Sequence, residues 1–291
     1  MDCWIVELLD CWIVDSLNLD PVTNNQKPET SNQKPVTSNQ KPETRNQQFV
    51  KKLTSDLIAL AFRDFLDGQK DGIIRVRTKL LGFTEQEELP VSYFFRTIND
   101  MPAWEKIALD ACRGRVLDAG AGAGAHSLEL QKRDHEVYAI DISEGAVDAM
   151  KQRGVKQTRC VSFLEFAGEK FDTILFLMNG IGMAANLDGL KAIFTHARSL
   201  LATGGKILLE STNIMYMYRE EDGSVLLPMG NKYYGEVEYK LSYKNHYSKP
   251  FPWLFADMDN LCSIAGDCGF VSKILFQGET DNYLIELNLG E

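Results

Sequence analysis

The segment over residues 114–125 constrains the fold of this chain more than any other feature. It reads Gly-Arg-Val-Leu-Asp-Ala-Gly-Ala-Gly-Ala-Gly-Ala, an apolar stretch that ends at Asp118, with glycines at 120, 122 and 124. Glycine adopts positive φ angles without strain and lets a ligand approach the backbone, because it has no Cβ. The apolar residues that follow favour a helix, whose free N–H groups and positive dipole end would face the same ligand. The segment therefore predicts a strand, a ligand-binding turn and a helix.

A second acidic residue follows at an informative spacing. The segment His135–Asp141 reads as another strand, and Asp141 lies 23 positions after Asp118. Sheets that bind nucleosides place an acid about 20 residues beyond the glycine turn, at the tip of the second strand, where it accepts hydrogen bonds from the ribose hydroxyls. The spacing predicts a nucleoside-binding α/β sheet.

The chain resembles the class I S-adenosylmethionine-dependent methyltransferases in four segments, which fall in the family's order and at its spacings. These are Val116–Gly124, Ala139–Ser143, Phe171–Gly180 and Leu201–Leu209. The likeness begins near Pro90, and Pro90–Arg96 and Met178–Gly182 look like a bacterial subgroup that acts on small molecules. The resemblance implies an α/β, Rossmann-like fold with a seven-stranded, mostly parallel sheet in the order 3-2-1-4-5-7-6. Helices on both faces and S-adenosyl-L-methionine as the cofactor are also implied.

The glycine turn leaves one alternative cofactor open. Gly120, Gly122 and Ala125 also fit the three small positions of the dinucleotide pattern G-x-G-x-x-G/A, so an NAD(P)-dependent oxidoreductase on a Rossmann fold is an alternative. Such a turn cradles a pyrophosphate, beside which the carboxylate of Asp118 is unfavourable. The ammonium and sulfonium of S-adenosylmethionine make the same carboxylate favourable.

The resemblance implies a cofactor role for individual residues. Asp118 and the backbone of Ala119, Gly120 and Gly122 would face the methionine part. Further along the chain, Asp141 would bind the ribose hydroxyls and Ile142 would cover the adenine ring.

The third strand departs from the family pattern. The acid expected to bind the adenine amino group is replaced by Ser162, so the backbone of Phe163 is a second candidate for that contact. Tyr93, Arg96 and Asn179 complete the cofactor-binding candidates, and Arg96 could pair with the cofactor carboxylate. Capping, packing and surface positions are the alternative roles for these residues.

Methyl transfer from a sulfonium mainly requires alignment and exclusion of water, so neither a protein nucleophile nor a metal is expected. Weak candidates for a proton acceptor are Glu210, at the end of the fifth strand, and His126, which the dipole at a helix start would keep neutral. Candidate substrate residues are aromatic and follow the fifth strand: Tyr216, Tyr218, Tyr233 and Trp253. Aromatic walls suit an apolar or cationic amine acceptor, although tyrosines are also common in ordinary strand packing.

Charge and amino-acid composition limit the classes of partner and the location that are expected for this protein. The net charge is −10, and no basic stripe suits a nucleic acid, so a small-molecule acceptor is favoured. No stretch approaches the ~20 apolar residues of a membrane helix, and no secretory signal is present. The six cysteines lack metal-ligand or disulfide spacing, which predicts reduced thiols and a cytoplasmic location.

Three regions are predicted along the chain. Residues 1–48 contain seven-residue repeats starting at Asn25, Asn32 and Asn39, each with a proline and without an apolar seam, which predicts a disordered tail. Residues 49–112 form an N-terminal helical cap, with helices over 55–66 and 103–112, a short segment over 72–80 and a glutamate-rich loop. Residues 113–291 form the methyltransferase domain.

Strands and helices alternate in the third region, which is typical of a parallel sheet. Predicted strands lie near 115–118, 136–140, 157–161, 172–177 and 205–211, and predicted helices near 125–132, 144–152, 187–202 and 255–267. Apolar and polar residues alternate over 236–243, which predicts a β insertion after strand 5, and 271–276 with 283–289 predict a closing hairpin.

Together these features favour methyl transfer to an oxygen or nitrogen of a small molecule. A non-catalytic methyltransferase-like binding module is a second alternative, because Ser162 is atypical and no base is evident. The sequence leaves the acceptor and the oligomeric state open.

Overall fold

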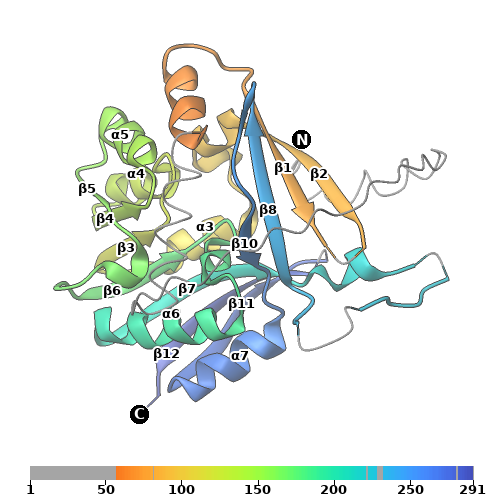
Figure 1. The fold of residues 1–291 in the computed structure, drawn as a ribbon. Helices are drawn as coiled ribbons and strands as arrows, with labels where there is room; N and C mark the ends of the chain where they lie inside the picture. Colours follow the sequence, from red (N-terminus) through yellow and green to blue (C-terminus); the bar gives the residue numbers. More distant parts are fainter. Residues whose placement is uncertain (1–56, 81, 221, 228–231, 280, 291) are drawn as a thin grey trace, which may run out of the picture. The chain divides into compact units, whose positions relative to one another are not determined.

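The computed structural model describes residues 57–80, 82–220, 222–227, 232–279 and 281–290 (Figure 1). The predicted tail over 1–48 lies outside the described residues, and the predicted domain boundaries stay predictions. None of the helices in the described part of the chain is long and apolar enough to cross a membrane.

A seven-stranded sheet forms the centre of the fold. Its strands are β3 (Arg115–Ala119), β4 (Glu136–Asp141), β5 (Gln157–Cys160), β6 (Phe171–Phe176), β7 (Leu201–Thr212), β11 (Phe270–Gln277) and β12 (Asn282–Leu289). They lie in the order β5-β4-β3-β6-β7-β12-β11, which is 3-2-1-4-5-7-6 when these strands are numbered along the chain. The first five run parallel, and β12 is antiparallel to both of its neighbours. The predicted fold class is confirmed.

Helices cover both faces of this sheet (Figure 1). They are α3 (Ala103–Ala111), α4 (Ala125–Lys132), α5 (Glu144–Arg153), α6 (Leu187–Leu200) and α7 (Met258–Asp267), and a further helix runs over residues 57–66. Val116 and Leu208 pack with α3 and α4 on one face, whereas their neighbours Leu117 and Ile207 pack with α6 and α7 on the other. Because successive side chains of a strand point to opposite faces, strands buried on both faces read as continuous apolar runs.

The helices begin where the sequence supplies caps. The side chains of Ser143, Asn186 and Asp257 accept hydrogen bonds from the first-turn N–H groups of α5, α6 and α7. Such N-caps satisfy donors that have no partner inside the helix.

A second sheet joins the N-terminal region to the insertion. It has the order β10-β8-β1-β2, with β9 paired to β8, and its strands are β1 (Ile73–Lys79), β2 (Thr84–Pro90), β8 (Glu236–Tyr243), β9 (His246–Tyr247) and β10 (Phe251–Leu254). The β insertion after strand 5 is therefore present, and its sheet is completed by β1 and β2, which precede β3 in the chain.

The glutamate-rich segment before Pro90 is strand β2, so the predicted loop is wrong. It is an edge strand, and its residues pair across to β1: Arg75 Nε lies 2.9 Å from Glu88 Oε1, and Arg77 donates to Gln86 at 3.1 Å. Charged side chains are common on edge strands because they discourage pairing with another chain. The signal for β2 is therefore the pairing of its polar side chains with those of β1, and an alternation of apolar and polar residues is not needed.

Candidate active site

The glycine turn follows β3 and has the predicted backbone conformation. Gly120, Gly122 and Gly124 have φ values of 78°, 56° and 79°, which residues with a Cβ rarely adopt. The N–H groups of Gly120 and Ala121 donate to the carbonyl of Ile140 at 2.9 and 3.0 Å. The turn is thereby fixed against the end of β4.

Asp141 connects the tip of β4 to this turn. Its Oδ2 accepts from the N–H of Gly122 at 3.0 Å, and its Oδ1 accepts from the N–H of Ser143 at 2.8 Å. Burial raises the pKa of Asp141, and these two N–H groups oppose the shift. Since a carboxylate oxygen has two lone pairs, each oxygen can accept one further hydrogen bond.

Asp118 lies deeper than Asp141. In the parallel register it is opposite Ala139, so Asp141 extends two residues further toward the carboxyl edge of the sheet. Asp118 is 2% exposed, and its Oδ2 accepts a 2.5 Å hydrogen bond from Ser127 Oγ in α4. Burial raises the pKa of Asp118, while His126 and Ser127 act in the opposite direction.

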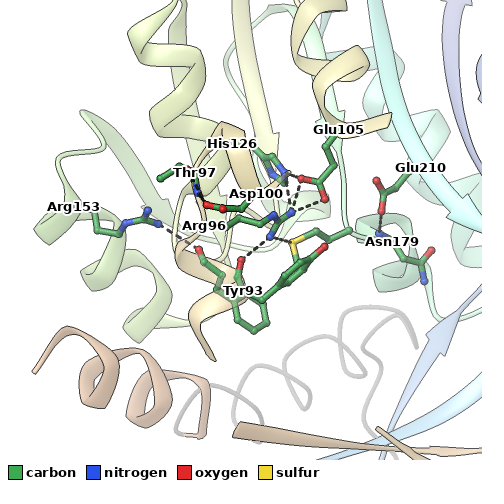
Figure 2. A network of polar contacts seen from close by, with 11 residues as sticks. Tyr93, Arg96, Thr97, Asp100, Glu105, His126, Arg153, Asn179 and Glu210 are labelled. Atoms are coloured by element: carbon green, nitrogen blue, oxygen red, sulfur yellow. Dashed lines mark hydrogen bonds and ion pairs between the residues drawn. The ribbon is translucent and has the colours of Figure 1, made fainter. Parts of the chain in front are cut away.

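A buried ionic network joins Arg96, Glu105 and His126 (Figure 2), and His126 lies in the first turn of α4, directly after the glycine turn. The guanidinium of Arg96 contacts both carboxylate oxygens of Glu105 at 2.5 Å, and His126 Nε2 lies 2.7 Å from Glu105 Oε2. Arg96 also donates to the carbonyl of Tyr93 at 2.7 Å and lies 3.9 Å above the Tyr93 ring. The Nε of Arg96 is buried without a hydrogen-bond partner among the described residues.

The charges in this network set its protonation states. Although burial opposes both shifts, His126 and Arg96 lower the pKa of Glu105 to about 2, and Glu105 raises the pKa of His126. The sequence argument that a helix start keeps His126 neutral is therefore wrong, because a carboxylate in direct contact outweighs the helix dipole. The contact with Glu105 therefore favours the protonated form of His126.

Sequence reasoning missed Glu105 and Arg153. Glu105 shares the buried face of α3 with Ala108 and Leu109, so an acid on the apolar face was the available signal. Arg153 donates to the carbonyls of Ala123, at 2.6 Å, and Phe95, at 3.3 Å. It ties the glycine turn to the 3₁₀ helix η1 (Val91–Phe95), and no local pattern indicated this contact.

Glu210 and Asn179 lie at the neighbouring strand ends (Figure 2). Glu210 Oε1 accepts from the N–H of Asn179 at 3.1 Å, whereas Oε2 is buried and has no hydrogen-bond partner in the described part of the chain. Burial, together with the charge of Glu105, raises the pKa of Glu210 to about 7. The amide of Asn179 donates to the carbonyl of Leu254 at 3.2 Å and accepts from Ser211 Oγ at 3.1 Å, so it tethers β10 to the end of β6.

The predicted adenine contacts lie after β4 and β5. Ile142 is partly exposed, and Ser162 is buried, with its hydroxyl donating to Glu165 Oε2 at 2.9 Å. The Phe163 ring packs against Phe176 with 4.9 Å between ring centroids. The side chain of Phe163 therefore belongs to the core, and its carbonyl accepts from the N–H of Phe166 at 3.2 Å.

The predicted substrate residues divide into two groups. The hydroxyls of Tyr218 and Tyr233 are engaged in hydrogen bonds. Tyr218 donates to the carbonyl of Tyr234 at 2.7 Å, and Tyr233 donates to Asp257 Oδ2 at 2.6 Å. Trp253 stacks on Tyr239, with 5.7 Å between ring centroids and 15° between their planes. It also packs on Gly182 in the 3₁₀ helix η4 (Gly180–Ala184), where an added Cβ would lie 2.2 Å from its Nε1.

Residues of η4 connect the indole of Trp253 to the glycine turn. Met183 follows Gly182 in η4, and its Cε lies 3.2 Å from the position of a Cβ added to Gly120. Of the predicted substrate residues, Tyr218 is buried, whereas Tyr216, Tyr233 and Trp253 are partly exposed.

Comparison with known proteins identifies the class of protein that this fold and site define. A family model described as a methyltransferase domain matches residues 116–205. The chain is 37% identical to a SAM-dependent methyltransferase from Bacteroides fragilis, solved in complex with S-adenosyl-L-homocysteine; the match covers 82% of this chain and 97% of that one, with a TM-score of 0.74. The chain therefore belongs to the S-adenosylmethionine-dependent methyltransferases, and S-adenosylmethionine is its cofactor, as the sequence predicted.

More distant structures have lower scores. An amino pentose methyltransferase from Micromonospora echinaspora is 17% identical, with a TM-score of 0.47 over 64% of this chain and 91% of that one. A methyltransferase from Clostridium acetobutylicum is 14% identical, with a TM-score of 0.49 over 66% and 94%. No curated protein matches the sequence.

Proposed function

We propose that this methyltransferase transfers the methyl group of S-adenosylmethionine to an oxygen or nitrogen of a small-molecule acceptor. The observation that carries the proposal is the fixed geometry of Asp141 and Gly122, in which a carboxylate at a strand tip and a glycine turn are joined by a 3.0 Å hydrogen bond. The net charge of −10 supports an acceptor other than a nucleic acid. The six cysteines, which lack disulfide spacing, favour a cytoplasmic location.

The residues present fit the cofactor. Asp141 retains acceptor capacity for the ribose hydroxyls. Ile142 and the Phe163 backbone would flank the adenine, and Ser162 would accept from its amino group. The buried Nε of Arg96 is a donor without a partner in the described residues, which suits the cofactor carboxylate.

On the methionine side, the carboxylate of Asp118 would stabilise the cationic end of the cofactor, and the backbone of Ala119, Gly120 and Gly122 would approach it closely. Tyr93 holds Arg96 through its carbonyl and its ring. Asn179 would contribute to the site indirectly, because its amide donates to the carbonyl of Leu254 and so fixes β10 near the end of β6.

The bound cofactor supplies an electrophilic methyl group on a sulfonium, and the chain has to orient the acceptor and exclude water. Trp253 and Tyr216 would form the acceptor wall, with Tyr218 and Tyr233 shaping the insertion from within. Residues 49–112 would act as a cap on the domain over 113–291.

Turnover with an unselected acceptor pool tests the proposal. Purified full-length protein is incubated with isotope-labelled S-adenosylmethionine and a metabolite extract, and products are separated by mass spectrometry. We expect one or a few labelled small molecules, which also names the acceptor. Tight binding of S-adenosylhomocysteine without any labelled product would contradict the proposed transfer and favour a binding module.

A further inference from the structure

Glu210 is the acidic residue of the site that neither cofactor binding nor the ionic network accounts for. It lies near the carboxyl end of β7 (Leu201–Thr212), the strand next to β6. Leu208 packs with the α3 side of the sheet, and Glu210, two residues later, projects to the same face. That face carries Glu105, which is close enough to influence the titration of Glu210.

One oxygen of Glu210 is held and the other has no hydrogen-bond partner in the described residues. Oε1 accepts from the N–H of Asn179, which fixes the direction of the carboxyl group, and Oε2 is closed off from solvent. A buried acceptor that has no partner is costly, and such a group is retained where function uses it.

The charged groups around Glu210 come from three elements. Glu105 of α3 raises the pKa of Glu210, while His126 of α4 and Arg96, which follows η1, lower it. Burial dominates, and the resulting value of about 7 suits a group that must accept and release a proton near neutral pH.

The other acidic and basic groups of the site belong to the ionic network or are assigned to the cofactor by the proposed function. His126 Nε2 contacts Glu105 Oε2 at 2.7 Å, which raises the pKa of His126, and Asp118 accepts the Ser127 hydroxyl. Asp141 is bound by two backbone N–H groups.

We propose that Oε2 of Glu210 is the proton acceptor for the nucleophile of the methyl acceptor. As the lone pair of the acceptor nitrogen or oxygen forms a bond to the methyl carbon, the carbon–sulfur bond breaks and its electron pair stays on sulfur. The N–H or O–H proton moves to Glu210 Oε2, and it passes to water that enters the site when the methylated product has left. The inference rests on the proposed function and deepens it, because it requires an acceptor atom that carries a proton.

Direct titration tests the proton-accepting group without turnover. Full-length protein is labelled with ¹³Cδ-glutamate, and its carboxyl resonances are followed by NMR between pH 4 and 9, with Glu210→Gln assigning the signal. Gln keeps an oxygen for the Asn179 N–H, so the fold is preserved, which thermal unfolding checks. We expect one resonance, missing in Glu210→Gln, with a midpoint near 7. A midpoint below about 5 overturns the proposal, because the group would then behave as an ordinary glutamate.

Methyl incorporation from labelled S-adenosylmethionine into the metabolite extract supplies the second readout. Methyl incorporation by Glu210→Gln should be about 10²- to 10⁴-fold slower, and its rate should no longer fall as the pH drops below about 7. Glu210→Asp should keep that fall in rate at low pH and should keep part of the wild-type rate. The matched control is Glu129→Gln, since Glu129 lies on α4 and pairs with Arg133.

The outcomes separate this inference from the proposed function. No incorporation by the wild-type protein means that the proposed function itself fails. Incorporation by Glu210→Gln at the wild-type rate and pH profile overturns the inference alone. S-adenosylhomocysteine affinity, measured by calorimetry, should stay within about threefold in Glu210→Gln. A loss above tenfold would make Glu210 a cofactor ligand and overturn the assigned role.

Discussion

At the scale of single residues, the site depends on carboxylates whose environments differ. Asp141 is held by backbone N–H groups, Glu105 by two cationic side chains, and Glu210 by a single N–H. The same functional group therefore has a very low pKa at Glu105 and a pKa of about 7 at Glu210. The neighbouring groups and the burial of each carboxylate, more than its residue type, determine its pKa.

Asp141→Ala should weaken binding of S-adenosylhomocysteine by about 1.5–3 kcal/mol, the usual worth of hydrogen bonds to a charged group. The physical reason is the loss of the acceptor for the ribose hydroxyls together with the restraint on Gly122. Calorimetry measures the affinity. Asp148→Ala is the control, because Asp148 is an exposed carboxylate on α5; equal affinities in the two variants would remove the ribose role.

Replacing Glu105 should destabilise the protein in a pH-dependent way. Glu105→Gln leaves Arg96 and His126 buried without their counter-charge, so we expect a loss of about 3–5 kcal/mol at pH 7. The folded pKa of Glu105 is about 2 and its ordinary value is 4.5, so its contribution is full above pH 4.5 and disappears as the pH falls toward 2.

Urea unfolding of both proteins between pH 3 and 7 measures this difference, which should shrink as the pH is lowered. Glu88→Gln serves as the control, since its pair with Arg75 is exposed and contributes at most about 1 kcal/mol. A stability difference that is constant with pH would show that the charge of Glu105 is not the cause.

At the scale of elements, the helix over 57–66 is packed directly on the start of α5. A Cβ added to Gly145 would lie 2.1 Å from the Cβ of Ala59. The same helix is tied to β8, because Asp64 Oδ2 accepts from Lys244 at 2.6 Å and from Tyr243 at 3.0 Å. These contacts hold the N-terminal region to both the methyltransferase sheet and the second sheet.

Gly145→Ala should therefore displace the helix over 57–66 and cost about 1–3 kcal/mol, as overpacking does. Hydrogen exchange of residues 57–66 should become faster. Gly266→Ala provides a matched control within α7, because a Cβ there meets nothing within 4 Å, and it should stabilise by about 0.5–1 kcal/mol. If both variants behaved alike, the tight helix contact would have no energetic role.

At the scale of the whole molecule, two sheets that are interleaved in sequence meet at the site. The seven-stranded sheet carries the glycine turn, and the second sheet brings Trp253 onto η4. The proposed acceptor wall would therefore depend on chain segments from both ends of the described region.

Deleting residues 1–48 should leave methyl transfer and thermal unfolding unchanged. The reason is compositional, since prolines recur in every repeat and no apolar seam is available for packing. Labelled-methyl incorporation by the truncated and full-length proteins is compared at equal concentration. Loss of turnover in a truncated protein that remains folded would assign the tail a function.

The sequence by itself determined the parallel sheet, its strand order through the family resemblance, and the glycine turn with Asp141. These features are local or periodic: positive-φ glycines, apolar strand runs and a fixed spacing are visible along the chain. Tertiary structure alone decided that β1 and β2 complete the sheet of the insertion. Tertiary structure likewise decided that Glu105 raises the pKa of His126, whereas the helix dipole would lower it. It also decided that Glu210 has one oxygen without a partner in the described residues. Pairing between distant strands and the titration of buried groups depend on neighbours brought together from remote parts of the chain, and no local pattern contains that information.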